Sequence, residues 1–248
     1  MTLVSFTVDY EPDCPPWMTS TFRGVEEATH PLLAMLAAEG VRATFFSTGV
    51  VAERYPDAMR AIVGAGHELG CHGHTHTRFT ALDEGAARDE IETSAAILRR
   101  HAPVTSFRAP NLVFPPAYVR LLAEAGFALD SSEAKYKRAP RDAGAPATRL
   151  TRIPASVTSS VLRLPRLLRD AYLSALASPV VLFVHPWEFV DLRHTRLRLD
   201  CRFNTGPIAL RRVREVLQTF AGRGTRFARM GELVAPDAAG IDRRVVGA

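Results

Sequence analysis

The 248-residue chain has little cysteine and almost no lysine. Its 3 cysteines, Cys14, Cys71 and Cys201, are too few and too widely spaced for a disulfide framework or a zinc-finger pattern. We therefore expect buried, inert thiols in a reducing cytoplasm. Lys135 and Lys137 are the only lysines, so nearly all of the positive charge comes from arginine.

A long apolar segment is also missing. No stretch approaches the roughly 18 to 20 apolar residues that cross a bilayer. The first residues, MTLVSFTVDYEPD, lack the basic region and apolar stretch of an export signal. We expect no transmembrane segment and a cytoplasmic protein. With 47% hydrophobic and 23% charged residues, the composition is typical of a globular protein, and we expect a single domain over residues 1–248 whose oligomeric state stays open.

Positive charge is the main bias of the composition. The formal net charge is +5 and the isoelectric point about 9.5, and arginines gather in the second half of the chain. A coding bias toward arginine and a binding patch for phosphate explain this excess equally well. No nucleic-acid-reading motif accompanies the charge, so we expect no nucleic-acid partner.

Strands and helices alternate along the chain. Apolar runs predict strands at residues 3–9, 42–49, 68–71, 105–108, 127–130, 180–184 and 225–228. Helical spacing predicts helices at residues 25–39, 55–65, 82–100, 115–125 and 208–221. This order predicts an α/β fold with a parallel sheet, closed as a barrel or open and doubly wound. The pattern fails at about residues 131–179, which we expect to be a long excursion over the barrel mouth.

Three histidines, His72, His74 and His76, follow the third predicted strand in the sequence CHGHTH. Two imidazoles four residues apart can point the same way from a helical turn or a tight loop. Zinc in enzymes commonly takes two histidines and a carboxylate and keeps one position open. We therefore expect His72 and His76 to bind a divalent metal together with Asp9 or Glu11, and His74 to lie next to these ligands.

Groups suited to acid–base chemistry stand at the ends of other strands. Asp9 and Glu11 are two residues apart, so both side chains project to one side of an extended chain. One can bind a metal while the other takes a proton from water. His185 can protonate a departing amine or be a structural residue. Arg108 can orient Asp9 through an ion pair or form a buried structural pair with it.

Five motifs, taken together and in order, resemble those of the polysaccharide deacetylases of carbohydrate esterase family four. They are FTVDYE, GHELGCHGHTH, FRAPN, LDSS and LFVHPWE, and the resemblance runs from Phe6 to about Leu233. It implies a distorted (β/α) barrel with about seven parallel strands. It also implies hydrolysis of an N-acyl group, an acetyl group above all, on an amino sugar.

The resemblance implies a role for each site residue. Asp9 would be the general base, oriented by Arg108, and His185 the general acid. His72 and His76 would bind zinc, or alternatively cobalt or nickel. The residues expected around the substrate are Tyr10, His74, Pro110, Asp130, Trp187 and Asn204.

The first motif departs from the commonest family pattern of two adjacent aspartates. Here Tyr10 follows Asp9, and Glu11 comes next. Branches with an acid, any residue and a second acid are more similar, which favours Glu11 as the third metal ligand, with Asp13 as an alternative. Some relatives work on small cyclic amides without a metal. A metal-free amidohydrolase or deformylase is therefore one alternative, and a catalytically inactive sugar-binding module is another.

The missing export signal bears on the expected substrate. Relatives that act on peptidoglycan or chitin usually work outside the cell. A nucleotide-linked or lipid-phosphate-linked N-acyl sugar, used to build a surface glycan, suits a cytoplasmic protein better. The phosphate of such a substrate can bind arginines of the excursion: Arg149, Arg152, Arg163, Arg166 and Arg169.

Overall fold

Parallel strands form a single sheet in the computed structural model, which describes residues 2–137 and 149–234. The strands are β1 (Leu3–Tyr10), β2 (Thr44–Ser47), β3 (Glu68–Cys71), β4 (Ser106–Phe107), β5 (Leu129–Asp130), β6 (Thr151–Arg152), β7 (Val180–Val184) and β8 (Arg226–Phe227). Their order is β6-β5-β4-β3-β2-β1-β7, and β8 pairs with the start of β1. The sheet curls into a half-barrel, which confirms the predicted α/β barrel of about seven strands and excludes the open, doubly wound alternative.

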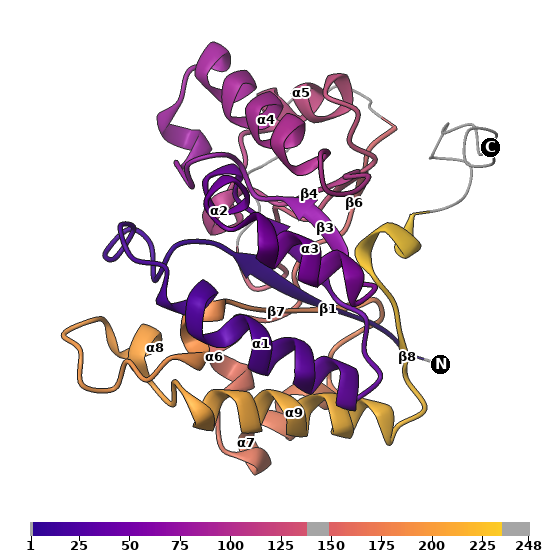
Figure 1. Cartoon of the computed structure of the whole chain (residues 1–248). Coiled ribbons are helices and arrows are strands. Elements are labelled where there is room, and N and C mark those ends of the chain that lie inside the picture. The colour runs from indigo at the N-terminus through magenta and orange to yellow at the C-terminus, as the bar shows by residue number, and fades with distance from the viewer. Residues whose placement is uncertain (1, 138–148, 235–248) are drawn as a thin grey trace.

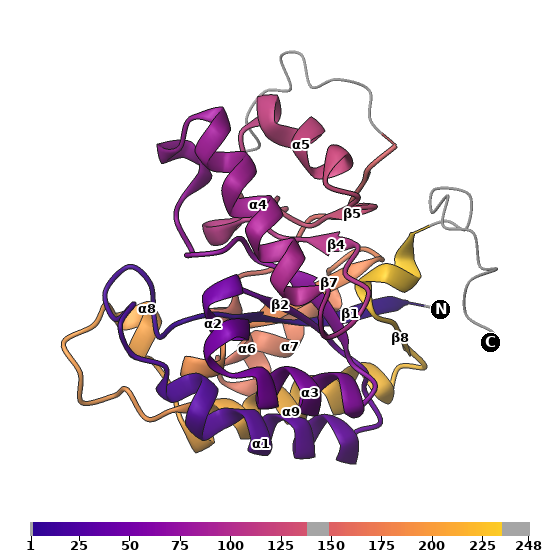
Figure 2. The ribbon, with the colours of Figure 1, turned by 45° about the horizontal axis from the view of Figure 1, so that its top comes forward.

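Helices cover the outside of this half-barrel. They are α1 (Arg23–Ala38), α2 (Gly49–Arg54), α3 (Pro56–Gly64), α4 (Glu84–Leu98), α5 (Val119–Glu124), α6 (Ser159–Leu162), α7 (Arg166–Ser174), α8 (Leu199–Arg202) and α9 (Pro207–Ala221). Short 3-10 turns lie at Phe79–Ala81, Pro110–Leu112, Pro116–Tyr118, Pro186–Phe189 and Met230–Leu233. Figures 1 and 2 show α1 and α9 side by side along one flank of the sheet, and α4 and α5 grouped beyond its opposite end.

β1 runs through the centre of the sheet, between β2 and β7. Its side chains alternate: Val4, Phe6, Val8 and Tyr10 belong to the main hydrophobic core, whereas the polar residues Ser5, Thr7 and Asp9 lie between them and are also buried. Because successive residues of a strand face opposite ways, one face of β1 packs against the helices and the other faces the barrel interior. The barrel interior is therefore polar at the carboxyl end of β1, where the candidate active site lies.

The excursion at residues 131–179 contains regular elements. Its described residues contain β6, α6 and α7. After β6, the chain returns to β7, where the Ser156 amide donates to the Val181 carbonyl at 2.8 Å and the Val181 amide donates to Ser156 Oγ at 2.9 Å. The excursion therefore connects β6, at one end of the strand order, to β7 at the other end. The remainder, residues 138–148, lies outside the described residues.

None of the helices in the two described ranges is both long and apolar enough to cross a membrane. The three cysteines, Cys14, Cys71 and Cys201, are buried and unpaired, as expected. Burial raises the pKa of the Cys71 thiol to about 11. This thiol is therefore protonated at neutral pH and a poor nucleophile.

Candidate active site

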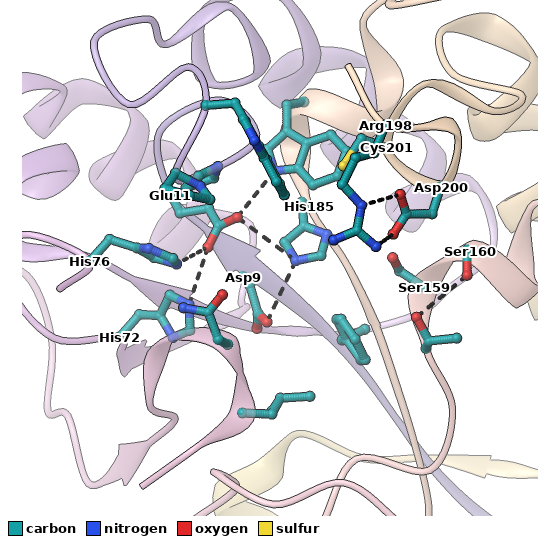
Figure 3. Close-up of a pocket in the computed structure, with 18 of the residues that line it drawn as sticks. Asp9, Glu11, His72, His76, Ser159, Ser160, His185, Arg198, Asp200 and Cys201 are labelled. Atoms are coloured by element: carbon teal, nitrogen blue, oxygen red, sulfur yellow. Dashed lines mark hydrogen bonds and ion pairs between the residues drawn. The ribbon is translucent and has the colours of Figure 1, made fainter. Parts of the chain in front are cut away.

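Three side chains suited to binding a metal meet at the carboxyl end of the sheet. Glu11 follows β1, and His72 and His76 follow β3, which is separated from β1 by β2 alone. One ligand atom from each of the three lies within 4.8 Å of the others. Glu11 Oε2 is 2.6 Å from His76 Nε2 and 3.3 Å from His72 Nε2. Figure 3 shows the Glu11 carboxylate reaching toward both imidazoles.

The hydrogen bonds around this cluster fit a bound cation. His72 Nδ1 lies 2.7 Å from the Arg108 carbonyl oxygen. A carbonyl can only accept, so Nδ1 carries the proton, and Nε2 is the ring nitrogen that faces the Glu11 carboxylate. A buried carboxylate needs a positive charge beside it, which a protonated imidazole or a bound metal ion can supply. Two imidazole nitrogens and one carboxylate oxygen are also a common ligand set of catalytic zinc.

The charge of Glu11 is set by its neighbours. Burial alone would raise the pKa of this carboxyl group. The charges of His76 and His185 and hydrogen bonds from the His72 and His76 imidazoles outweigh burial and lower it well below its ordinary value. The indole Nε1 of Trp187 donates to Glu11 Oε1 at 3.1 Å. The carboxylate is thus ionised and held from both oxygens.

The loop that carries the two histidines is fastened by Glu90 of α4. The Glu90 carboxylate accepts from the backbone amides of His74 and Thr75, at 2.7 and 3.0 Å, and from the Thr75 hydroxyl. His76 has a φ of 66°, in the left-handed region that a non-glycine residue rarely occupies. The Glu90 contacts hold the loop in a shape that the backbone alone would not favour. Sequence analysis missed Glu90, which lies on a helix in a charged run.

Asp9 lies beside the cluster and is held by Arg108. Arg108 Nη1 donates to Asp9 Oδ1 at 2.6 Å and to Thr7 Oγ1 at 2.7 Å, and Nη2 donates to Ser131 Oγ at 2.9 Å. The guanidinium also lies over the Phe46 ring, 4.3 Å from its centroid. Arg108 is fully buried and so fixes one oxygen of Asp9, while Oδ2 faces His185 at 4.0 Å.

His185 lies beside the cluster, next to Glu11 and Asp9. Its Nε2 is 3.8 Å from Glu11 Oε1, and its Nδ1 is 2.6 Å from Glu188 Oε1. Burial would lower the pKa of His185, but the negative charges of Glu11, Glu188 and Asp9 outweigh burial and raise it to about 9. The ring stacks on Trp187 at 4.7 Å. His185 is therefore a cation at neutral pH, with Nε2 directed toward the two carboxylates.

Glu188 and Arg163 form a support for His185 that sequence analysis missed. Both are buried, and Arg163 Nε lies 2.9 Å from Glu188 Oε2. The same guanidinium donates to the backbone carbonyls of Asp200 and Phe203. Glu188 stands in the HPWE motif, so its position three residues after His185 was a usable signal. Arg163 lies in the excursion, where no pattern indicated a partner.

A cavity of about 470 Å³ opens over these groups. Asp9, Glu11, His72, His76, His185 and Trp187 line it, together with residues of the excursion and of the segment around α8. Arg108 does not reach the cavity, since it lies behind Asp9. The predicted ligands, base, acid and Trp187 are therefore brought together by the fold.

The other residues expected around the substrate lie away from the cavity wall. Tyr10 is fully buried in the core, with its hydroxyl 2.5 Å from Thr29 Oγ1. Alternation along β1 sends Tyr10 to the face opposite Asp9 and Glu11. The His74 ring packs against Gly49 on the outer side of its loop.

Pro110 and Asp130 also depart from the expectation of direct substrate contact. Pro110 is buried at the start of a 3-10 turn, and the next two residues reach the cavity instead. Asp130 is buried and pairs with Arg152 at 3.1 Å, and it accepts from the Ser132 amide at 2.9 Å. Burial raises the pKa of Asp130 in spite of these contacts. Both residues shape the walls behind the site.

Asn204 and Asp13 also serve the structure near the site. Asn204 Nδ2 donates to the Arg163 carbonyl at 2.9 Å, which ties the RFNTG loop to the support of His185. Asp13 accepts from the backbone amides of Arg23 and Gly24, each at 2.8 Å, and so caps the first turn of α1. With both carboxylate oxygens used in this way, Asp13 is no alternative to Glu11 as a ligand.

Comparison with known proteins agrees with this arrangement. A family model described as polysaccharide deacetylase matches residues 2–129, slightly more than half of the chain. The chain is 33% identical over 90 residues to the peptidoglycan-N-acetylglucosamine deacetylase of Bacillus cereus, over 36% of this chain and 31% of that protein. It is 29% identical over 103 residues to a chitooligosaccharide deacetylase of a Bradyrhizobium species, over 40% and 47%. The chain thus spans less than half the length of these relatives.

A solved structure resembles the whole fold. It is a family 4 carbohydrate esterase from Streptomyces lividans in complex with acetate, with a TM-score of 0.63 and 21% identity. The match covers 92% of each chain. At this coverage the match extends beyond residue 129, so the half-barrel is of the deacetylase type.

Proposed function

This chain belongs to the polysaccharide deacetylase family, and on that premise we propose that it is a metal-dependent hydrolase that removes an N-acetyl or similar N-acyl group from an amino sugar. One observation carries the proposal. Three ligand atoms, from Glu11, His72 and His76, face one another in a buried cluster. Asp9 and His185 lie beside this cluster, with Asp9 Oδ2 4.0 Å from His185 Nε2. A base, a metal site and an acid around one cavity are the groups that amide hydrolysis needs.

Glu11, His72 and His76 would hold the ion. A divalent ion supplies a Lewis acid for the acyl carbonyl and lowers the pKa of water. Zinc suits the two imidazoles and the carboxylate, and cobalt or nickel can take the same set. Trp187 and the Arg108 carbonyl orient two of these ligands and so define where the ion would lie.

Asp9 is the proposed general base. Arg108 holds Oδ1, which leaves Oδ2 to accept a proton from the water that attacks the acyl carbon. The fixed orientation avoids the loss of rotational freedom at the moment of reaction.

His185 is the proposed general acid. Glu188 binds Nδ1, so the proton on Nε2 is directed into the cavity. An amine anion is too poor a leaving group to depart unprotonated, and the imidazolium donates its proton to the amide nitrogen as the C–N bond breaks. The products are a carboxylate, acetate in the simplest case, and the free amine of the sugar.

Metal content tests this proposal first. The purified protein, reconstituted with zinc and freed of loose metal, is expected to contain about one equivalent by elemental analysis. The His72→Ala, His76→Ala double variant is expected to contain none. A His74→Ala variant is the matched control, because His74 stands in the same loop but points away from the cavity.

Turnover is the second measurement. Acetate release is measured with N-acetylated nucleotide sugars and lipid-phosphate sugars, the substrates that the sequence predicts. Cell fractionation separately tests the predicted cytoplasmic location. Loss of turnover in the double variant but not in His74→Ala supports the proposal. Turnover by a protein that binds no metal would contradict it and favour the metal-free amidohydrolase. Metal binding without any turnover would favour an inactive sugar-binding module.

A further inference from the structure

An apolar groove adjoins the catalytic cavity. It lies where α6 and α8 approach each other and has a volume of about 670 Å³. We refer to it as the α6–α8 groove. Its apolar walls are formed by Val161, Leu164, Leu199 and Phe203.

The groove and the catalytic cavity are continuous. Ser160, Arg198 and Asp200 line both of them. Figure 3 shows these three residues on the side of the cavity beyond His185, away from His72. A molecule whose reacting amide lies at the metal site therefore has a direct path past His185 into the groove.

The walls of the groove are held in place by the support of His185. Arg163, at the end of α6, donates to the carbonyls of Asp200 and Phe203 near α8. The same guanidinium pairs with Glu188. The groove is thus preformed and fixed relative to the proposed acid, as a substrate subsite should be.

The groove offers little to a sugar. Its charged residues, Arg198 and Asp200, are bound to each other at 3.0 and 3.1 Å, and Ser160 Oγ lies 3.4 Å from the Thr158 hydroxyl. Leu199 at its edge is 65% exposed. Recognition of sugar hydroxyls needs unpaired polar groups, whereas an alkyl chain needs apolar walls.

We propose that the substrate carries an alkyl chain on the side of the amino sugar that leaves with the amine, and that this chain lies in the α6–α8 groove. The inference rests on the proposed function and narrows it to a lipid-linked amino sugar. Each methylene buried in the groove raises affinity up to about fourfold, so burial of three predicts roughly a fiftyfold gain.

A pair of probes tests the inference. The methyl and octyl glycosides of N-acetylglucosamine differ only in chain length, and kcat/KM is measured for each. We expect the octyl glycoside to be favoured roughly fiftyfold. In Leu199→Ser the ratio should fall toward one, because a hydroxyl replaces the exposed edge of the groove. Leu167→Ser on α7 is the matched control, since Leu167 is 86% exposed and lies outside the groove.

Binding of octyl glucoside, which has no amide, separates the groove from the reaction. Titration calorimetry below the micelle concentration is expected to show binding that Leu199→Ser weakens and Leu167→Ser does not. Binding with this pattern but without hydrolysis of either glycoside would support the groove and count against the proposed function. Equal kcat/KM for the two glycosides would overturn the groove alone, as would a ratio that survives in Leu199→Ser. If octyl glucoside does not bind and neither glycoside is hydrolysed, both the proposed groove and the proposed function are overturned.

Discussion

The buried pair of Asp9 and Arg108 should dominate the stability of the barrel interior. Arg108→Met keeps the length of the side chain but removes its charge. The change leaves the Asp9 carboxylate buried without its 2.6 Å partner, which costs about 3–5 kcal/mol. It also removes hydrogen bonds to Thr7 and Ser131, each contributing about 1 kcal/mol. We therefore expect the free energy of unfolding to fall by about 5–7 kcal/mol.

A second substitution isolates the charge pair. Asp9→Asn alone should also destabilise strongly, because Arg108 then keeps a buried charge without its counter-ion. In the double variant neither charge remains, so the loss should be smaller than the sum of the two single losses by about 3 kcal/mol. The assay is urea unfolding with chelator present, so that metal binding does not contribute to stability.

The control pair is Arg88 and Glu92, which are exposed and four residues apart on α4. Its coupling energy should be only about 0.3–0.5 kcal/mol. If Asp9 and Arg108 gave a coupling as small as this, the carboxylate would not depend on the guanidinium. The assignment of Arg108 as the residue that orients the base would then fail.

Three further predictions follow from single contacts. Glu188→Gln removes a negative charge beside His185 and so lowers its pKa from about 9. The alkaline limb of the pH–rate profile should move to lower pH, and kcat at pH 8 should fall about twofold for the first unit of pKa lost and about tenfold for two. A limb that does not move would show that Glu188 does not set the pKa of the acid. Glu90→Ala frees the loop that carries His76, so zinc affinity in a chelator competition should drop roughly 10- to 100-fold, whereas an unchanged affinity would show that the loop needs no such support. Burial and nearby arginines lower the pKa of His67 to about 4. Because the unfolded chain binds a proton more readily, the stability contributed by neutral His67 should be complete above about pH 6.5 and decline toward pH 4, by up to about 3 kcal/mol; urea unfolding at pH 7 and pH 5 should show a smaller difference in His67→Gln.

Elements with a strong local pattern could be predicted to the residue. β3 and β7 begin and end where the sequence indicates, because apolar runs bounded by polar residues mark buried parallel strands. α2 was not predicted, because it lies between the strand predicted at residues 42–49 and the helix predicted at residues 55–65. It starts immediately after β2, with Thr48 accepting from the Val51 amide, so no linker separates the two patterns. β6 is two residues long, and a strand this short has no periodicity to detect.

The same contrast applies to the site, where residues at strand ends could be predicted from the sequence and contacts between distant segments could not. Glu11, His72 and His76 could be grouped because parallel strands present their carboxyl ends at one edge. Tyr10 was expected near the substrate from the family resemblance. The alternation that puts Asp9 and Glu11 on one side of the strand turns the Tyr10 side chain to the other side. The contact between Arg163 and Glu188 joins an unpatterned excursion to the segment after β7. No local rule connects residues so far apart, and only the folded chain reveals their contact.

In the proposed mechanism, different halves of the chain act on the two ends of the reacting bond. The residues that would hold the ion, orient the base or take the first proton all precede residue 130: Asp9, Glu11, His72, His76 and Arg108. The proposed acid His185, the Glu188 that holds it and the walls of the α6–α8 groove all follow residue 130, on the side of the departing amine. Changes in the walls of the α6–α8 groove can therefore alter which amine is released, while the proposed ligands, base and acid stay the same. A chain with this arrangement can change its substrate while the reaction that it catalyses stays the same.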